Sequence, residues 1–226
     1  MERLFRGIRK FQKMHYKNEQ EFFQKISKGQ SPDVLFFACS DSRVDPNLIT
    51  QSRVGELFIV RNVGNIVPAN NPLHKKTCTA AAIEFALLVL KVTDIVVCGH
   101  SDCGALKALY YDRKDFEDKP NLKEWLDTAS EVKEDVLSQI KDPSYKKRIE
   151  MTEKRYLIRQ IENLKTYPLV NEAMKEGKVN IHGWYYDIGT GAVYTYNELR
   201  NIFEKIDHNE EEFMGISGGD PCEDMP

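Results

Sequence analysis

Short apolar runs, separated by polar and charged segments, predict a sheet of buried strands. Three of these runs, Val34–Ala38, Leu57–Arg61 and Ile95–Cys98, are rich in β-branched and aromatic residues and are too short for typical helices. Continuous apolar runs are typical of parallel strands buried on both faces. Two later runs, Val179–Tyr186 and Val193–Tyr196, flank a glycine-containing turn and predict an antiparallel hairpin.

Apolar residues at helical spacing predict helices around these strands. The first 28 residues predict a helical arm in two parts, which packs either on its own domain or on a neighbouring subunit. Thr77–Leu90 predicts an alanine-rich helix, Asp112–Gly177 predicts several amphipathic helices, and Glu198–Lys205 predicts a last helix. The expected fold is α/β, with a mostly parallel central sheet of four strands plus an antiparallel edge strand, flanked by helices and preceded by the arm.

Length and composition predict one domain that acts on a small molecule. The 226 residues divide into the arm (1–28), a catalytic core (29–206) and a loose acidic tail (207–226). A net charge of −3 provides no basic field for nucleic acid or membrane binding. Five scattered cysteines and the lack of a signal-peptide pattern favour a reducing compartment, which we expect to be the cytoplasm. The longest apolar stretch, Ile83–Val92, is too short to span a bilayer.

Metal-binding side chains follow two of the predicted strands. Cys39 comes directly after the first strand. His100 and Cys103 follow the third strand and lie 61 and 64 positions after Cys39. Because the carboxyl ends of parallel strands meet at one edge of a sheet, we expect these three side chains to lie together. Two thiolates and an imidazole suit Zn²⁺, and three protein ligands leave a fourth position open for chemistry. Cys98, two residues before His100 on the same strand, is expected to point away from this group and not to serve as a fourth ligand.

The two motifs resemble those of the β-class carbonic anhydrases. In that family a Cys-x-Asp-x-Arg motif, here Cys39, Asp41 and Arg43, is followed about sixty residues later by His-x-x-Cys, here His100 and Cys103. The resemblance implies a zinc ion held by the two cysteines and the histidine. It also implies reversible hydration of carbon dioxide to bicarbonate and a proton, by zinc-bound hydroxide that the Asp–Arg dyad orients.

The same resemblance implies substrate-binding residues and self-association as a dimer or tetramer. In plant-type members a Gln before the first strand reaches the neighbouring subunit's active site, and Gln30 matches that position. Phe58, Val63 and Phe85 match the apolar pocket for the substrate, with Phe85 at a position where Tyr is common. The backbone N–H of Gly104 matches a donor to the oxygen atom that gains charge.

A further difference from some family members predicts an open site. The resemblance is dense over residues 29–110 and looser at His182–Asp187. Members in which the aspartate closes onto zinc have a Trp where this chain has Phe36, together with an Arg and a Tyr that Arg61 and Tyr186 match. Since Phe lacks the indole N–H donor, we expect Asp41 to stay on its arginine.

Other functions remain open at this stage. A sister activity on the same fold, hydrolysis of carbonyl sulfide or carbon disulfide, uses similar metal chemistry, and a non-catalytic zinc protein or bicarbonate sensor would keep the ligands alone. A thiol phosphatase is excluded because only three residues separate Cys39 from Arg43, where the phosphate-binding loop of those enzymes needs five. A cytidine-deaminase-like site is excluded by the missing His-x-Glu and Pro-Cys-x-x-Cys motifs.

Overall fold

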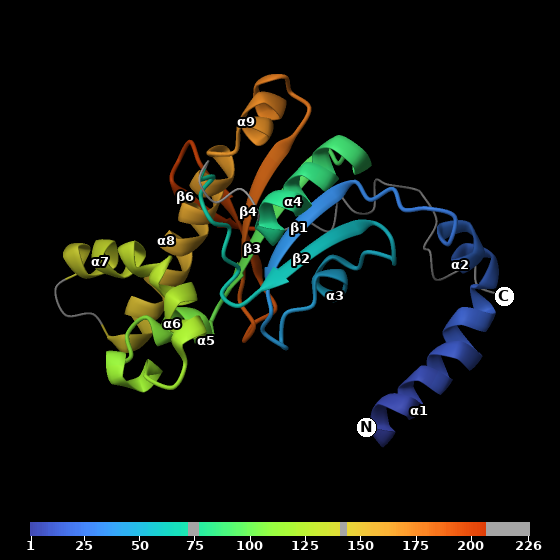
Figure 1. Cartoon of the computed structure of the whole chain (residues 1–226), viewed down its shortest axis with the longest axis horizontal. Helices are drawn as coiled ribbons and strands as arrows, with labels where there is room; N and C mark the ends of the chain where they lie inside the picture. Colours follow the sequence, from blue (N-terminus) through green and yellow to red (C-terminus); the bar gives the residue numbers. More distant parts are fainter. Residues whose placement is uncertain (72–76, 141–143, 207–226) are drawn as a thin grey trace.

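A six-stranded mixed sheet forms the centre of the molecule (Figure 1). The computed structural model describes residues 1–71, 77–140 and 144–206. The strand order is β2-β1-β3-β4-β5-β6, in which β2, β1, β3 and β4 are parallel and β5 and β6 are added antiparallel. The expected parallel group of four strands with an antiparallel addition is confirmed. The strands are β1 (Val34–Cys39), β2 (Leu57–Asn62), β3 (Asp94–His100), β4 (Asn180–Tyr186), β5 (Val193–Asn197) and β6 (Ile202–Lys205).

Helices flank this sheet, and side-chain caps fix where several of them begin. The Asp45 carboxylate accepts the backbone N–H of Leu48 at the start of α3, and the Thr77 hydroxyl accepts that of Ala80 at the start of α4. Because Asp45 caps α3, the nearby Asp41 carboxylate is not the cap of that helix and can make other contacts. The helices are α1 (Glu2–Lys10), η1 (Phe11–Tyr16), α2 (Gln20–Ile26), α3 (Pro46–Thr50), α4 (Cys78–Glu84), η2 (Phe85–Leu90), α5 (Gly104–Ala108), η3 (Arg113–Phe116), α6 (Pro120–Asp127), α7 (Ser130–Gln139), α8 (Tyr145–Lys165) and α9 (Pro168–Lys175).

The interior strand β1 is buried on both faces, as its uninterrupted apolar sequence predicts. Leu35 and Phe37 belong to the main core, which includes residues of β3, α4, α8 and α9. Phe36 and Ala38 point to the other face, where they pack in a smaller cluster with residues of β3 and β4. Burial on both faces fixes the register of β1 and hence the position of Cys39 at its end.

The prediction of a last helix over Glu198–Lys205 is wrong. Ile202–Lys205 instead forms β6, which pairs antiparallel with β5. The Phe203 ring packs on the Tyr196 ring with centroids 5.2 Å apart, and Asn201 in a left-handed conformation (φ 52°) turns the chain. Backbone pairing with the open edge of β5, together with this aromatic contact, outweighs the weak helix preference of the charged residues.

The N-terminal arm extends away from the sheet and its flanking helices (Figure 1). No residue of α1, η1 or α2 is buried, and Leu4, Phe5 and Ile8 of α1 are each more than half exposed. Arg53 links α2 to the segment before β2, because its guanidinium lies 4.0 Å from the centroid of the Phe22 ring. The arm therefore does not form part of the hydrophobic core of its own chain.

Two further expectations concern chain organisation. The division into one domain stays a prediction, and the expected loose tail at 207–226 lies outside the described residues. Within the part of the chain that the structure describes, no helix combines the length and apolar character needed to cross a bilayer.

Gly183 on β4 allows α8 to approach the sheet closely, and this contact yields a stability prediction. A Cβ atom at Gly183 would lie 2.5 Å from Cδ1 of Ile161 and 3.3 Å from Cβ of Tyr196. We expect Gly183→Ala to lower the free energy of unfolding by about 1–3 kcal/mol through overpacking. The control is Gly99→Ala on β3, where the added atom would meet Leu157 at an ordinary 3.7 Å. Chemical denaturation measures both, and equal stabilities of the two variants would contradict this packing argument.

Candidate metal centre

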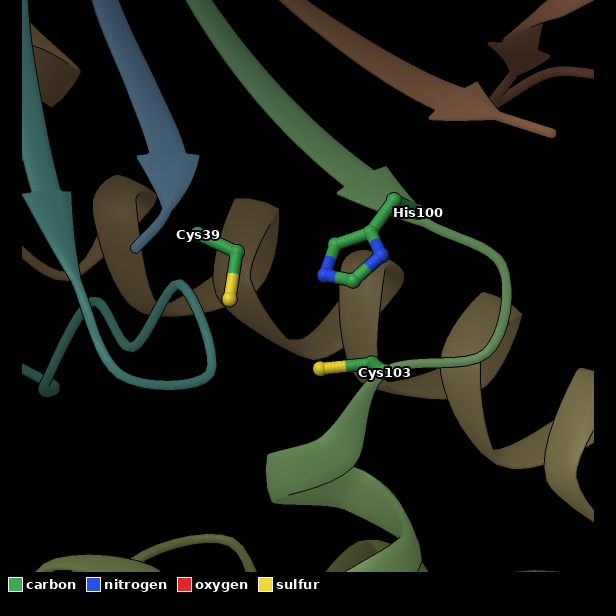
Figure 2. A group of neighbouring side chains, drawn as sticks. All are labelled: Cys39, His100 and Cys103. Atoms are coloured by element: carbon green, nitrogen blue, oxygen red, sulfur yellow. The ribbon is translucent and has the colours of Figure 1, made fainter. Parts of the chain in front are cut away.

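Two adjacent parallel strands end at one small cluster of metal-binding side chains. Cys39 is the last residue of β1, His100 is the last residue of β3, and Cys103 follows three residues later at the start of α5. Figure 2 shows their two sulfur atoms and a ring nitrogen directed toward a common point. The three ligand atoms lie within 4.8 Å of one another, and all three residues are buried. This geometry could hold a metal ion.

The His100 ring is oriented for metal binding. Its Nδ1 lies 2.9 Å from the carbonyl oxygen of Ser101, so Nδ1–H donates there and the lone pair is on Nε2. Nε2 is buried and has no hydrogen-bond partner among the described residues. A buried acceptor that lacks a donor but faces two sulfur atoms fits a cation better than it fits an ordinary core histidine.

The two thiols share a hydrogen bond, and this makes them ionise unequally. The hydrogen bond from Cys103, opposed by burial and helped by His100 and the backbone N–H of Asp41, lowers the pKa of Cys39 to about 4. The same hydrogen bond, together with burial, raises the pKa of Cys103, although the N–H groups of Ala105 and Leu106 at the start of α5 act in the opposite direction. One thiolate thus forms readily, whereas the second needs a nearby positive charge, which a divalent cation would supply.

The imidazole responds to the same charge. Burial of His100 favours its neutral form, but the adjacent Cys39 thiolate and the Ser101 carbonyl oxygen outweigh burial and raise the pKa of the ring. A metal ion must therefore displace a proton from the ring as well as from Cys103 at low pH.

Asp41 and Arg43 form a bidentate ion pair beside the cluster. Arg43 Nε donates to Oδ1 of Asp41 at 2.9 Å, and Nη2 donates to Oδ2 at 2.7 Å. This hydrogen bonding, more than any other contribution, holds the pKa of the Asp41 carboxyl well below its usual range. The Asp41 backbone N–H also donates to the Cys39 sulfur at 3.4 Å, so the carboxylate belongs to the loop that carries a metal ligand.

Arg43 also joins the two ligand loops. Its Nη1 donates to the Asp102 carboxylate, and its Nη2 donates to the Asp102 carbonyl oxygen, both at 3.1 Å. Asp102 lies between His100 and Cys103 in a left-handed conformation (φ 61°), and Lys107 pairs with its carboxylate. The guanidinium therefore connects the segment after β1 to the segment after β3.

Arg61 donates two hydrogen bonds to the backbone of the first ligand loop. Its Nε donates to the Cys39 carbonyl oxygen at 3.0 Å, and its Nη2 donates to that of Asp41 at 2.8 Å. Phe36 is buried, with its ring 5.9 Å from the Trp184 ring. Cys98 packs in the cluster around Phe36, away from the metal-binding group, where burial raises the pKa of its thiol to about 12.

The single chain brings together the predicted ligands and dyad, but not all the predicted substrate residues. The rings of Phe58 and Phe85 contact each other at 5.7 Å, and Phe58 pairs with Leu35 near the start of β1, whereas Cys39 ends that strand. Gln30 precedes β1 and is exposed. Of the remaining predicted residues, Val63 is 45% exposed on the loop after β2, and Gly104 is the first residue of α5.

Helix α8 contributes residues that the sequence interpretation missed. Glu153, Tyr156, Leu157 and Gln160 line the small enclosed cavity at the metal cluster. The Tyr156 hydroxyl is buried and has no hydrogen-bond partner among the described residues. Glu153 accepts hydrogen bonds from the backbone of Cys103 and from a tyrosine, yet burial dominates and raises the pKa of its carboxyl. The available signal was spacing, because Glu153 lies four residues after Ile149 and four before Leu157, on the buried face of α8.

Comparison with known proteins identifies the family. A family model for carbonic anhydrase matches residues 34–193, a range that contains the metal cluster and the Asp41–Arg43 pair. The chain belongs to the carbonic anhydrase family. The structure of the β-carbonic anhydrase CcaA matches with a TM-score of 0.83 at 37% identity, over 91% of this chain and 98% of that one. The expected membership of the β class of these enzymes is thus confirmed.

Curated carbonic anhydrases match over most of their length. One from Synechococcus elongatus is 41% identical over 193 residues, which are 85% of this chain and 70% of that protein. Another, from Pseudomonas aeruginosa, is 38% identical over 215 residues, or 95% of each chain. A tetrameric β-carbonic anhydrase of Sordaria macrospora matches with a TM-score of 0.69 at 30% identity, over 86% of this chain and 92% of that one.

The ligand assignment predicts that two buried cysteines differ in their importance for metal binding. Cys39→Ala removes one of three ligands, so we expect the purified variant to lose its metal. Cys98→Ala removes a buried thiol of the same size on the neighbouring strand, so we expect it to retain about one metal ion per chain. Elemental analysis after gel filtration measures both variants. Full metal content in Cys39→Ala would contradict the assignment.

The protonation of the ligands predicts a pH dependence of metal affinity. The pKa values of Cys103 and His100 both lie above their ordinary values, so protons compete with the metal as the pH falls. We expect the apparent affinity for zinc to rise about tenfold or more per pH unit from pH 6 to 8, because at least one proton leaves on binding. Competition with a chromophoric chelator measures the affinity, and a constant affinity across this range would contradict the assignment.

Proposed function

We propose that this protein is a zinc-dependent carbonic anhydrase that catalyses the reversible hydration of carbon dioxide to bicarbonate and a proton. One observation carries the proposal: a buried Cys-His-Cys group lies beside the ionised carboxylate of Asp41, which Arg43 fixes in a bidentate pair. A protein that only bound the metal would have no need for an oriented carboxylate at that place. Membership of the carbonic anhydrase family supports the same reaction.

The donor set favours zinc. Two thiolates and one imidazole suit a tetrahedral site for this soft-to-borderline cation, and three protein ligands leave one position for the reaction. When bound, zinc supplies the Lewis acidity that makes a water molecule a nucleophile near neutral pH. Because the two thiolates cancel the charge of the cation, the surrounding residues must also contribute to activating the water molecule.

Asp41 is the residue that we assign to this task. Both of its oxygens face Arg43, and the low pKa of the carboxyl keeps Asp41 ionised at neutral pH. A carboxylate oxygen has lone pairs beyond the one that its arginine uses, so Asp41 can accept the hydrogen of the attacking water and orient it toward carbon dioxide. Arg43 keeps that carboxylate away from the metal position, as the predicted open site requires.

A second copy of the chain would complete the substrate pocket. Gln30, Phe58 and Phe85 lie toward the start of β1 and β2 or on exposed surface, whereas the metal ligands lie at the opposite end of the strands. The exposed apolar side chains of α1, and those of Leu88 and Val89 beside Phe85, offer surface for association. We therefore propose that these residues serve the site of a neighbouring subunit, in a dimer or a tetramer. Val63 follows β2 and Gly104 is the first residue of α5, directly after Cys103 of the same chain.

We expect the enzyme to act in the cytoplasm. The cysteines of the described residues are free thiols, and the two that hold the metal must be reduced to do so. No charge field on this chain of net charge −3 favours nucleic acid.

Substitution of Asp41 tests the proposed mechanism. We expect Asp41→Asn to bind zinc as the parent protein does, but to lose about 10²-fold or more in the rate of carbon dioxide hydration, because an amide cannot replace the ionised acceptor. Asp45→Asn is the matched control, since Asn caps a helix as well as Asp does and α3 would be preserved. Stopped-flow hydration at pH 8–9 measures the rates.

Rates of the parent protein with carbon dioxide and with its sulfur analogues separate the proposed function from the alternative functions. An inactive but zinc-loaded parent protein would indicate a non-catalytic zinc protein, such as a bicarbonate sensor. Faster turnover of carbonyl sulfide or carbon disulfide than of carbon dioxide would indicate the sister activity. An Asp41→Asn variant with the parent's rate would remove Asp41 from the mechanism.

A further inference from the structure

We propose that Glu153 and Tyr185 form a buried pair that positions the metal ligand Cys103. The backbone N–H of Cys103 donates a hydrogen bond to Oε1 of Glu153 at 2.9 Å. The other oxygen, Oε2, accepts the hydroxyl of Tyr185 at 2.8 Å. The inference deepens the proposed function, because it concerns the same metal site.

Both members of the pair are enclosed by the fold. Glu153 is 3% exposed and Tyr185 is 4% exposed. The two hydrogen bonds hold both oxygens of this carboxylate, so its position is set by α8 and β4 together. These two elements are part of the main core, which makes the pair a rigid reference point for the ligand loop.

The loop needs such a reference point. Ser101 and Asp102 connect β3 to α5 in a tight turn, and Asp102 has the left-handed conformation (φ 61°) that costs energy for residues with a side chain. The backbone N–H of Ser101 donates to the Tyr186 carbonyl oxygen at 2.9 Å and holds the start of the turn. The contact with Glu153 holds its other end, at the residue that carries the sulfur ligand.

The orientation of the Cys103 amide also matters for the sulfur atom. Cys103 is the residue that precedes α5, so its own N–H has no partner within that helix. The Glu153 carboxylate, on α8, accepts the hydrogen bond from this N–H. The Cys103 sulfur is thereby left to the N–H groups of Ala105 and Leu106 and to the metal position, so its direction depends on the backbone that Glu153 fixes.

The cavity at the metal cluster places Glu153 next to the ligands without making it one. Glu153 lines this cavity together with Cys39, His100 and Cys103, but the metal-binding group contains only the last three. Its two carboxylate oxygens are already occupied by Cys103 and Tyr185. Glu153 is therefore a positioning residue that acts through the backbone of Cys103, and its removal should alter the metal site before it alters the rest of the fold.

Three variants and one control test this role. Glu153→Gln keeps an acceptor oxygen for the Cys103 N–H, Glu153→Ala removes it, and Tyr185→Phe removes only the hydroxyl that locks the carboxylate. Tyr167→Phe is the matched control, because the buried Tyr167 hydroxyl donates to the Pro68 carbonyl oxygen at 2.8 Å and does not line the cavity at the metal cluster.

Two readouts are needed besides activity. Zinc affinity is measured by competition with a chromophoric chelator, and the thiolate-to-metal charge-transfer band is measured after substitution with Co²⁺. We expect Glu153→Ala to bind zinc about 10–100-fold more weakly and to shift the Co²⁺ band, by analogy with other groups that orient metal ligands. Glu153→Gln should stay within about threefold of the parent, and Tyr185→Phe should lie between the two. Tyr167→Phe should change neither readout.

The outcomes separate this proposal from a merely structural role. A folded Glu153→Ala variant with the parent's zinc affinity and Co²⁺ band would overturn it. If Glu153→Ala fails to fold, Tyr185→Phe decides: a result equal to that of Tyr167→Phe in both readouts overturns the proposal, and a selective loss in Tyr185→Phe supports it. Failure of the parent protein to hydrate carbon dioxide, with these metal-binding differences intact, would refute the proposed function but leave the positioning role standing.

Discussion

The cost of ionising two sulfur atoms inside a protein is the constraint on which the rest of this structure depends. Cys39 and Cys103 are both buried and share a hydrogen bond that favours one thiolate and opposes the second. A divalent cation would remove that opposition, and Nε2 of His100, which has no hydrogen-bond partner among the described residues, would complete the set of donors. The sheet brings these groups together because β1 and β3 are adjacent and parallel, so their carboxyl ends open on the same edge.

The surroundings of the cluster divide the remaining work between charge and position. Arg43 forms an ion pair with Asp41, and it also links the two ligand loops through Asp102. Arg61 holds the backbone of the first loop, while Glu153 on α8 contacts the backbone of the second. The residues that carry chemistry are thus few, but each is fixed by a partner from a different element of the fold.

Much of this arrangement could be predicted from the sequence, because its signals are local. Apolar runs defined the strands, and two short motifs at strand ends indicated the ligands and the Asp41–Arg43 pair. Glu198–Lys205 was misjudged because strand pairing with β5 and the contact of Phe203 with Tyr196 come from tertiary structure. Glu153 was missed for a related reason: its partner Cys103 lies 50 positions earlier, and only the fold brings α8 against that loop.

Reconstitution with zinc tests the central claim most directly. The protein is stripped of metal with a chelator, zinc is added back in known amounts, and the initial rate of carbon dioxide hydration is measured after each addition. We expect the stripped protein to be inactive. The rate should then rise linearly until about one zinc ion per chain has been added, and stay constant beyond that point. Full activity in protein shown to contain no metal would contradict the central claim.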